Sequence, residues 1–203
     1  NKGILIPRHT TVSQNLIVKP AHGLLIYNTD EKALKFNEGT KDNPDWFRLN
    51  RTNLSVKCSN TNFSARVNNG NKAPFMGQIE WNDHEDLYEV QSGRNQIKVN
   101  QSGIYLIIVN ASLINNTNSN LEHLSANMQL GINGDASGSF ASTAYTRGIG
   151  DHTKTSLHLN VVLELNAGDN ISVTISRTDS FRPGPISMRF WSAESSNIYI
   201  EKL

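Results

Sequence analysis

The sequence has a single cysteine, Cys58, among its 203 residues. One thiol excludes an internal disulfide and supplies too little of the set of about four ligands that a structural zinc ion takes. No apolar stretch reaches the roughly 18 residues of a membrane span, so we expect no membrane insertion. Lys plus Arg number 19 and Asp plus Glu 18, so no broad field exists to attract nucleic acid or anionic lipid.

Charge is also scarce, at 18% of residues, and Asn, Ser and Thr take its place. Their short side chains compete for backbone hydrogen bonds, which favours strands and turns over helices. With 37% hydrophobic residues, the chain can bury a core without cross-links, as one sandwich with an appendage or as two small domains. The chain starts Asn1-Lys2-Gly3 without Met or a signal-like segment, so we interpret it as part of a longer protein.

The first fifty residues form a pattern of their own. Residues 3–8 predict a short apolar strand that Pro7 ends. Two apolar runs, residues 23–28 and 33–37, flank the turn-forming segment 29–32 and predict a β-hairpin. We place an N-terminal module at residues 1–50, a linker in the Asn/Ser/Thr-rich residues 51–62, and a second domain at residues 63–203.

The motif order of the N-terminal module resembles a short module found in surface and fibre proteins of Bacteroidetes bacteria and their phages. It consists of Gly3-Ile4-Leu5-Ile6-Pro7-Arg8, Thr10-Thr11, Pro20, Gly23-Leu24-Leu25-Ile26-Tyr27-Asn28-Thr29-Asp30, Phe36, Gly39 and Trp46. The resemblance implies a neck or adaptor before a distal domain. Because a two-stranded hairpin is marginal alone, chains lying side by side would bury Leu24, Ile26, Leu34 and Phe36. The alternative is that the hairpin packs on its own sandwich.

From Phe63 onward, short strands alternate with turns at a spacing typical of a sandwich. The run from Ile104 to Val109 is almost continuously apolar, as in a strand covered on both faces. Asn133-Gly134 is a strong type I′ turn signal. The expected strands cover residues 63–67, 77–81, 95–99, 104–109, 127–132, 156–165, 171–175 and 198–200.

Several of these pieces together resemble the C1q/TNF-like jelly-roll family. They are Phe63-Ser64-Ala65, Gly103 with Tyr105, Asn133-Gly134, and Leu163-x-Leu165-x-x-Gly168-Asp169-x-Ile171. Ile107 stands where the family usually has Phe, and Ser195 and Asn197 stand where it has an aromatic residue and Gly. The fold class we predict is therefore all-β, a C1q/TNF-like jelly-roll β-sandwich with an N-terminal β-hairpin neck module.

The jelly-roll resemblance implies a homotrimer around a threefold axis, with loops presented to ligands. A sandwich strand that is apolar on both faces needs a cover, which a neighbouring subunit can supply. Tyr105 and Tyr199 are candidate trimer contacts. The alternative is that both are core aromatics with the hydroxyl at an edge.

The densest polar cluster follows Trp81. Asp83, Glu85 and Asp86 are weak candidates for holding calcium, which some relatives bind, although the spacing matches no calcium loop and a solvated loop is the default. No Gly-x-Ser-x-Gly elbow is present, and His158 alternates with Leu157 and Leu159 on the outward face of a strand. We therefore expect no catalytic residues, no cofactor and no enzymatic activity.

Long polar loops carry the candidate ligand contacts. Tyr145, Arg147, Phe181 and Arg182 lie in them, and aromatic and Arg side chains supply most hot-spot energy in binding sites. Each of the four also has a purely structural alternative.

The sequence thus predicts a homotrimeric recognition or adhesion knob. It would be the receptor-binding tip of a phage tail fibre or spike, or of a bacterial surface protein, extracellular and bound to a cell-surface glycan or protein. The alternatives are a purely structural trimerising surface or capsid component and, behind it, a carbohydrate-active enzyme. The sequence does not separate phage from bacterial origin.

Overall fold

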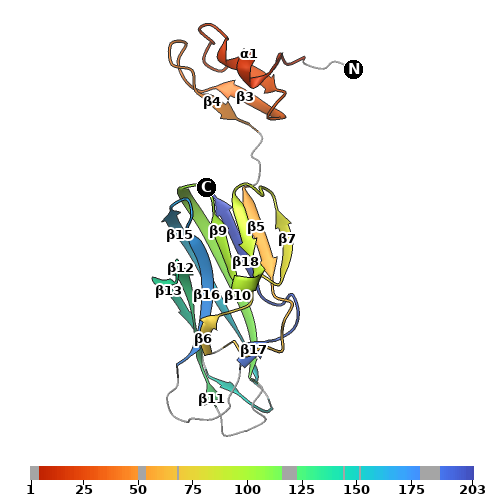
Figure 1. Ribbon diagram of the computed structural model, residues 1–203, viewed down its shortest axis with the longest axis vertical. Coiled ribbons are helices and arrows are strands. Elements are labelled where there is room, and N and C mark those ends of the chain that lie inside the picture. The colour runs from red at the N-terminus through yellow and green to blue at the C-terminus, as the bar shows by residue number, and fades with distance from the viewer. Residues whose placement is uncertain are drawn as a thin grey trace. The chain divides into compact units, whose positions relative to one another are not determined.

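The computed structural model describes residues 5–49, 54–67, 69–115, 123–143, 145–150, 152–178 and 188–203. The chain divides into two compact units, Asn1–Thr52 and Asn53–Leu203. Figure 1 shows the ribbon of each unit.

The N-terminal unit is a small four-stranded sheet with one short helix. Its strands pair in the order β1-β2-β3-β4, with β1 parallel to β2 and the other pairs antiparallel. The predicted hairpin is confirmed as β2 and β3. The elements are β1 (Arg8–His9), α1 (Thr11–Asn15), β2 (Leu25–Asn28), β3 (Ala33–Asn37) and β4 (Trp46–Arg48).

Two features of this unit differ from the prediction. The first strand is Arg8–His9, because the residues described before Pro7 pair with no strand. Helix α1, in a composition that disfavours helices, begins where the Thr10 side chain accepts a hydrogen bond from the Ser13 amide. Tertiary contact then holds it, since the buried amide of Asn28 donates to Gln14 Oε1 at 2.8 Å.

The second unit is a sandwich of two sheets packed face to face (Figure 1). Sheet I contains β15 (Lys154–Leu165), β10 (Gly103–Asn115), β18 (Asn197–Lys202), β5 (Ser55–Ser59) and β7 (Gln78–Asn82), in that order, with β17 (Met188–Phe190) on β10. Sheet II contains β13 (Asp135–Ser142), β12 (Ala126–Ile132), β16 (Asn170–Arg177), β9 (Gln96–Val99) and β8 (Tyr88–Gln91), with β6 (Asn69–Lys72) on β16. A pair of short strands, β11 (His123–Leu124) and β14 (Thr146–Arg147), and the 3-10 turn η1 (Ser92–Arg94) complete the unit.

The core lies between the two sheets and follows the two-residue period of the strands. On β10 every second residue from Tyr105 to Leu113 is buried, while the residues between them are half-buried. Ile107, which replaces the family's usual Phe, is 0% exposed. The leucines predicted on one face of the long strand β15 also point inward, with Leu157, Leu159 and Leu165 buried.

The start of the sandwich lies earlier than predicted. Residues 55–59, which the sequence analysis placed in the linker 51–62, form β5 between β18 and β7, whereas residues 63–67 form no strand. Strand β5 has only two apolar residues, Val56 and Cys58, and both are buried. Its polar residues Ser55, Lys57 and Ser59 alternate with these on the other face of the strand, where Ser55 and Ser59 are also buried. With three polar residues of five, its composition resembled that of a linker.

The Asn133-Gly134 turn between β12 and β13 is confirmed. Asn133 has φ 56° and Gly134 has φ 95°, the left-handed pair that a type I′ turn requires. Asn133 also fixes the neighbouring loop, because its side-chain amide donates to Asp169 Oδ1 at 2.8 Å. The turn therefore links the β12–β13 hairpin to the turn at Gly168 and Asp169.

The lone thiol, Cys58, makes the folded chain sensitive to alkaline pH. Cys58 is fully buried, and burial, followed by the charge of Glu80, raises its pKa from 9.0 to about 12. Between these values the unfolded chain binds fewer protons than the folded chain, so the free energy of unfolding falls as pH rises above 9. We expect a loss of at most about 1.4 kcal/mol per pH unit from this group.

Urea unfolding at stepped pH measures this effect. Burial also raises the pKa of Tyr88, so the variant Cys58→Ala isolates the contribution of the thiol and should show a flatter alkaline limb. The folded protein should also resist a thiol-labelling reagent at pH 8 and react once unfolded. Rapid labelling of the folded chain would contradict the burial of Cys58.

Candidate functional site

The candidate site is the outer face of sheet I, the face turned away from the core. Period-two alternation places every second residue of β10, β15 and β18 on it. A strand with one solvent-facing side normally carries polar residues there, yet this face is apolar over a large part of its area. Its apolar members are Ile104, Leu106, Ile108, Ile114, Val162, Tyr199 and Trp81.

The most exposed apolar side chains gather where β10 begins. Ile104 is 53% exposed and Val162 is 55% exposed. Val162 lies directly opposite Leu106 on the neighbouring strand, and Leu106 follows Ile104 on the same face. An exposed cluster of this kind indicates a surface that another molecule covers.

An aromatic and charged cluster borders the apolar residues on β18, β5 and β7. The rings of Trp81 and Tyr199 meet edge to face with centroids 6.3 Å apart, and Lys57 Nζ lies 5.1 Å from the centre of the Trp81 ring. Lys57 also pairs with Glu80 at 2.7 Å. The cluster is held rigidly, because Trp81 Nε1 donates to Ser55 Oγ at 3.0 Å and that hydroxyl donates to Asp83.

The two candidate trimer contacts separate in the structure. Tyr199 lies half-buried on the outer face, where burial and then its hydrogen bond to Glu201 raise its pKa. The prediction that Tyr105 contacts a neighbouring chain is wrong, because Tyr105 is 0% exposed. Its hydroxyl donates a hydrogen bond to the Gln101 carbonyl at 2.6 Å. A side chain without exposed surface in the single chain cannot contact a partner chain. The same burial raises the pKa of Tyr105.

A polar band crosses the same face. His158 Nδ1 lies 2.8 Å from Asn110 Oδ1, and Asn110 Nδ2 donates to Asn197 Oδ1 at 3.0 Å. The three residues come from β15, β10 and β18. His158 is thus part of a chain of hydrogen bonds across neighbouring strands, as expected for an outward residue.

The acidic candidates Asp83, Glu85 and Asp86 are exposed. Across the residues that the structure describes, no group of three or more His, Cys, Asp or Glu side chains is placed to hold a metal ion. Asp83 instead accepts the hydrogen bond from Ser55 Oγ at 2.7 Å.

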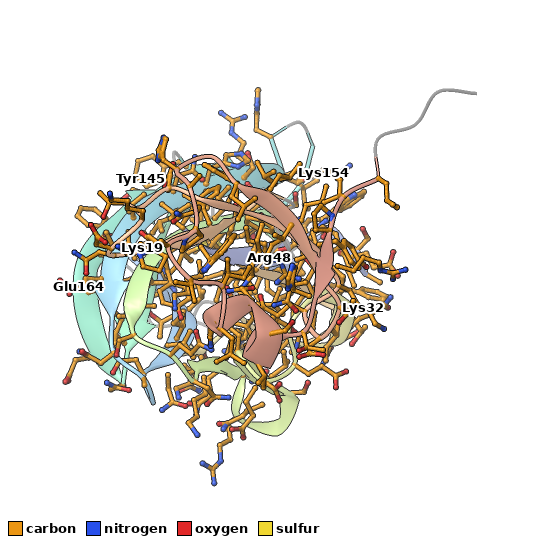
Figure 2. The ribbon with its side chains drawn as sticks, turned by 90° about the horizontal axis from the view of Figure 1, so that it is seen from above. Lys19, Lys32, Arg48, Tyr145, Lys154 and Glu164 are labelled. Atoms are coloured by element: carbon orange, nitrogen blue, oxygen red, sulfur yellow. The ribbon has the colours of Figure 1, made fainter. Side chains whose placement is uncertain are left out.

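Two of the four candidate ligand contacts, Tyr145 and Arg147, lie within the described residues. Tyr145, which Figure 2 labels, is 68% exposed, and Arg147 on β14 is also exposed. Thr146, the other residue of β14, lies between them and is buried, whereas Tyr145 immediately precedes the strand. Phe181 and Arg182 lie outside the described residues. In Figure 1, β11 lies at the end of the sandwich away from the C-terminus, and β14 pairs with it.

Sequence reasoning missed a second aromatic contact in sheet I. Lys154 Nζ lies 3.4 Å from the centre of the Trp191 ring, and Trp191 is 45% exposed. Figure 2 labels Lys154, the first residue of β15, and Glu164, the residue before its last.

The sequence does contain a signal for the apolar face of sheet I. In the run 104–109, residues on both sides of the strand are apolar.

The N-terminal unit has an open face of its own. Side chains at alternate positions, Leu25 and Tyr27 on β2 with Leu34 and Phe36 on β3, are half-buried, and Phe47 on β4 is 50% exposed. Phe36 and Phe47 meet edge to face with centroids 5.4 Å apart.

Ile26 was wrongly included among the residues that neighbouring chains would bury. It is 1% exposed and points to the opposite face of the sheet. Asn28 on that face bonds to Gln14 of helix α1, so the unit itself covers Ile26.

Comparison with known families bears on the N-terminal part of the chain. Residues 1–64 match the family model described as a phage tail-like trimerisation region. No curated protein sequence matches the chain. Within the described residues, every helix is too short or too polar to cross a membrane.

Comparison with solved structures bears on the sandwich. The Eiger TNF of S. frugiperda superposes with a TM-score of 0.52 at 17% identity, covering 75% of this chain and 94% of that one. The sandwich is a jelly roll of the C1q/TNF type. Two further similar structures are the globular domain of zebrafish complement 1qA (TM-score 0.49, 12% identity, 74% and 96% covered) and murine APRIL (TM-score 0.48, 16% identity, 73% and 98% covered).

Within this jelly roll, the last strand pairs in a defined register, which places Asn197, the residue that stands where the family has Gly. Asn197 lies opposite Asn110 on β10 and Ser59 on β5. Strand β18 is therefore central in sheet I, with Tyr199 on the outer face and Ile198 and Ile200 in the core.

Proposed function

We propose that this chain is a homotrimeric recognition head on the surface of a phage particle or a bacterial cell, and that it binds a cell-surface glycan or protein without catalysis. The observation that carries the proposal is the apolar outer face of sheet I. Ile104 and Val162 are more than half exposed on this face, whereas the opposite face of the same sheet is buried in the core. The match of residues 1–64 to a phage tail-like trimerisation region supports three as the number of chains.

A ring of three chains also fits the chemistry of this face. A threefold ring uses a head-to-tail contact, in which one surface meets a different surface of the neighbour. The outer face of sheet I offers apolar residues at one edge and the Lys57–Glu80–Trp81 cluster at the other, so it has two unlike borders. The open face of the N-terminal unit, with Phe36 and Phe47, supplies a second assembly surface.

Recognition would then use two exposed side chains, Tyr145 directly before β14 and Arg147 on it. Three copies held in one head raise the avidity of individually weak contacts by roughly 10²–10⁴-fold. The purely structural alternative keeps the trimer and removes the ligand. It is favoured by the description of the matched family, which names trimerisation only.

Light scattering of the full chain at micromolar concentration tests the assembly. We expect three times the chain mass of 22.5 kDa, and a single-chain mass would overturn the proposal. A cell-binding assay with the same sample separates the two functions. Loss of binding in Arg147→Ala with the trimer mass retained supports recognition, whereas a trimer that binds no cell of any candidate host supports the structural role.

A further inference from the structure

The outer face of sheet II has a hollow that the assembly described above does not use. Its volume is about 330 Å³, and it lies over β6, β16, β12 and β13. This is within the size range of small-molecule sites. The polar residues that line it are Asn71, Lys72, Gln129, Asp135, Ser172 and Thr174.

Two irregularities in strand pairing coincide with this hollow. The register shifts between Gln129 and Gly131 in the β12–β13 pair, and between Thr174 and Ser176 in the β16–β6 pair. Such bulges bend a strand locally and redirect side chains, and they are frequent beside binding sites. They turn a flat sheet face into a groove.

Glycine keeps the floor of the groove open. A Cβ atom at Gly131 would lie 3.1 Å from Ser172 Oγ and 3.5 Å from the Asp135 carbonyl oxygen. Any side chain at this position would therefore stand between the Ser172 hydroxyl and the groove. The backbone of β12 is left accessible where a ligand can approach it.

The groove has hydrogen-bonding groups that the protein does not use. Ser172 is only 2% exposed and lines the groove, and its hydroxyl has no partner among the residues that the structure describes. The same holds, within those residues, for the Gln129 amide, the Thr174 hydroxyl and the Asp135 carboxylate. Ser172 is the buried member of this set, whereas Gln129 and Thr174 are half-buried and Asp135 is exposed. The groove therefore presents donors and acceptors that a ligand can use in place of water.

The charges and shape of the groove define the chemistry of that ligand. Among its described lining residues, Lys72 is the one cation and Asp135 the one anion, and Lys72 already donates to Gln96. The groove is thus close to neutral and offers two side-chain amides, two hydroxyls and a carboxylate, which together donate and accept. Such a set suits vicinal hydroxyl groups better than a phosphate or sulfate.

An aromatic platform stands beside these groups. Phe140 lies directly opposite Gln129 on the outward face of β13 and is 64% exposed. Its ring presents a partly negative face, which attracts the C–H groups on the flat side of a pyranose. We propose that this groove binds one neutral sugar unit of a glycan. The inference deepens the proposed recognition function, on which it depends for its biological role.

Saturation-transfer NMR on the full chain tests the groove directly. The probes are the methyl glycosides of glucose, galactose and N-acetylglucosamine at up to about 20 mM, because a single sugar unit should bind with a dissociation constant on the order of 1 mM. N-acetylneuraminic acid serves as the anionic comparator. We expect at least one neutral probe to bind, and to bind more tightly than the acid, which Asp135 repels.

Matched serine variants locate the site. Ser172→Ala should weaken binding about 3–10-fold through loss of one hydrogen bond, and Gln129→Ala should weaken it to a similar extent. Ser176→Ala, the same change on the same strand and face but outside the groove lining, should leave the affinity unchanged.

The outcomes are separable from the proposed assembly. No signal from any neutral probe, tighter binding of the acid, or equal affinities for Ser172→Ala and Ser176→Ala would each overturn the sugar site. Light scattering of the same samples reports the trimer independently, because binding of one sugar unit does not require three chains. A monomer that binds sugar would therefore refute the assembly and leave the groove intact.

Discussion

Replacing Ile104 and Val162 together by aspartate is expected to convert the assembled protein into single chains. Both side chains are more than half exposed on the outer face of sheet I, so the folded chain tolerates a charge at each position. In a closed trimer the exposed half of each side chain would also be buried, so losing each would remove about 0.8–1.5 kcal/mol of apolar burial, half the value for a whole side chain. The two losses together correspond to roughly a 10–10²-fold weaker association.

The new carboxylates add a further cost, because an unpaired charge that is desolvated at an interface is strongly unfavourable. Light scattering over a dilution series measures the effect as a shift from three times the chain mass to the single mass. Ile149→Asp is the matched control, since Ile149 is 42% exposed and lies outside sheet I. Circular dichroism of each variant confirms that its strands are intact.

An unchanged trimer in the double variant would relocate the assembly surface. The open face of the N-terminal unit is then the remaining candidate, and Phe47→Asp tests it, since Phe47 is 50% exposed. Either result identifies which of the two apolar faces holds the chains together.

Phe190→Ala is expected to cause the largest loss of folding stability. Phe190 is 0% exposed and packs edge to face on Phe75, with ring centroids 5.1 Å apart and an interplanar angle of 67°. It also anchors the short strand β17 opposite Leu113 of β10. Truncation of a buried Phe costs about 3–5 kcal/mol, because the lost contacts leave a cavity that the surroundings only partly fill.

Urea unfolding measures this cost as a lower midpoint with an unchanged slope. Trp191→Ala provides the comparison, because Trp191 is the next residue along but is 45% exposed and stacks on Lys154. An exposed cation–π pair contributes only about 0.5–1 kcal/mol. Equal losses in the two variants would show that β17 does not belong to the core.

The strand pattern was the part of the fold that local sequence predicted best. Alternation in residues 127–132 and 156–165 corresponds to β12 and β15, and Asn133-Gly134 forms the expected left-handed turn. These features depend on period-two burial and on backbone torsions, both of which a short window of sequence specifies. Strand β5 escaped notice because its neighbours β18 and β7, far away in the sequence, are what make Ser55 and Ser59 strand residues.

The residues of the candidate site likewise differ in whether the sequence predicted their exposure correctly. Tyr145 and Arg147 are exposed as their loop context suggested, and Tyr199 is on the outer face of sheet I. Tyr105 is in the core instead, because the layer packed on a sheet decides which of its faces is buried, and Tyr105 packs on Tyr88 of sheet II. Ile26 was misplaced for the same reason, since helix α1 covers its face of the N-terminal sheet.

By itself the sequence determined that this chain is built of strands, that it needs no disulfide, and that the strand around residues 104–109 is apolar on both sides. Those properties reside in composition and in contacts between near neighbours. Only the tertiary structure decided which apolar side chains remain uncovered and which polar ones lack partners. Leu106 meets Val162, and Gln129 meets Thr174, only after strands distant in sequence have paired, and no local pattern encodes that pairing.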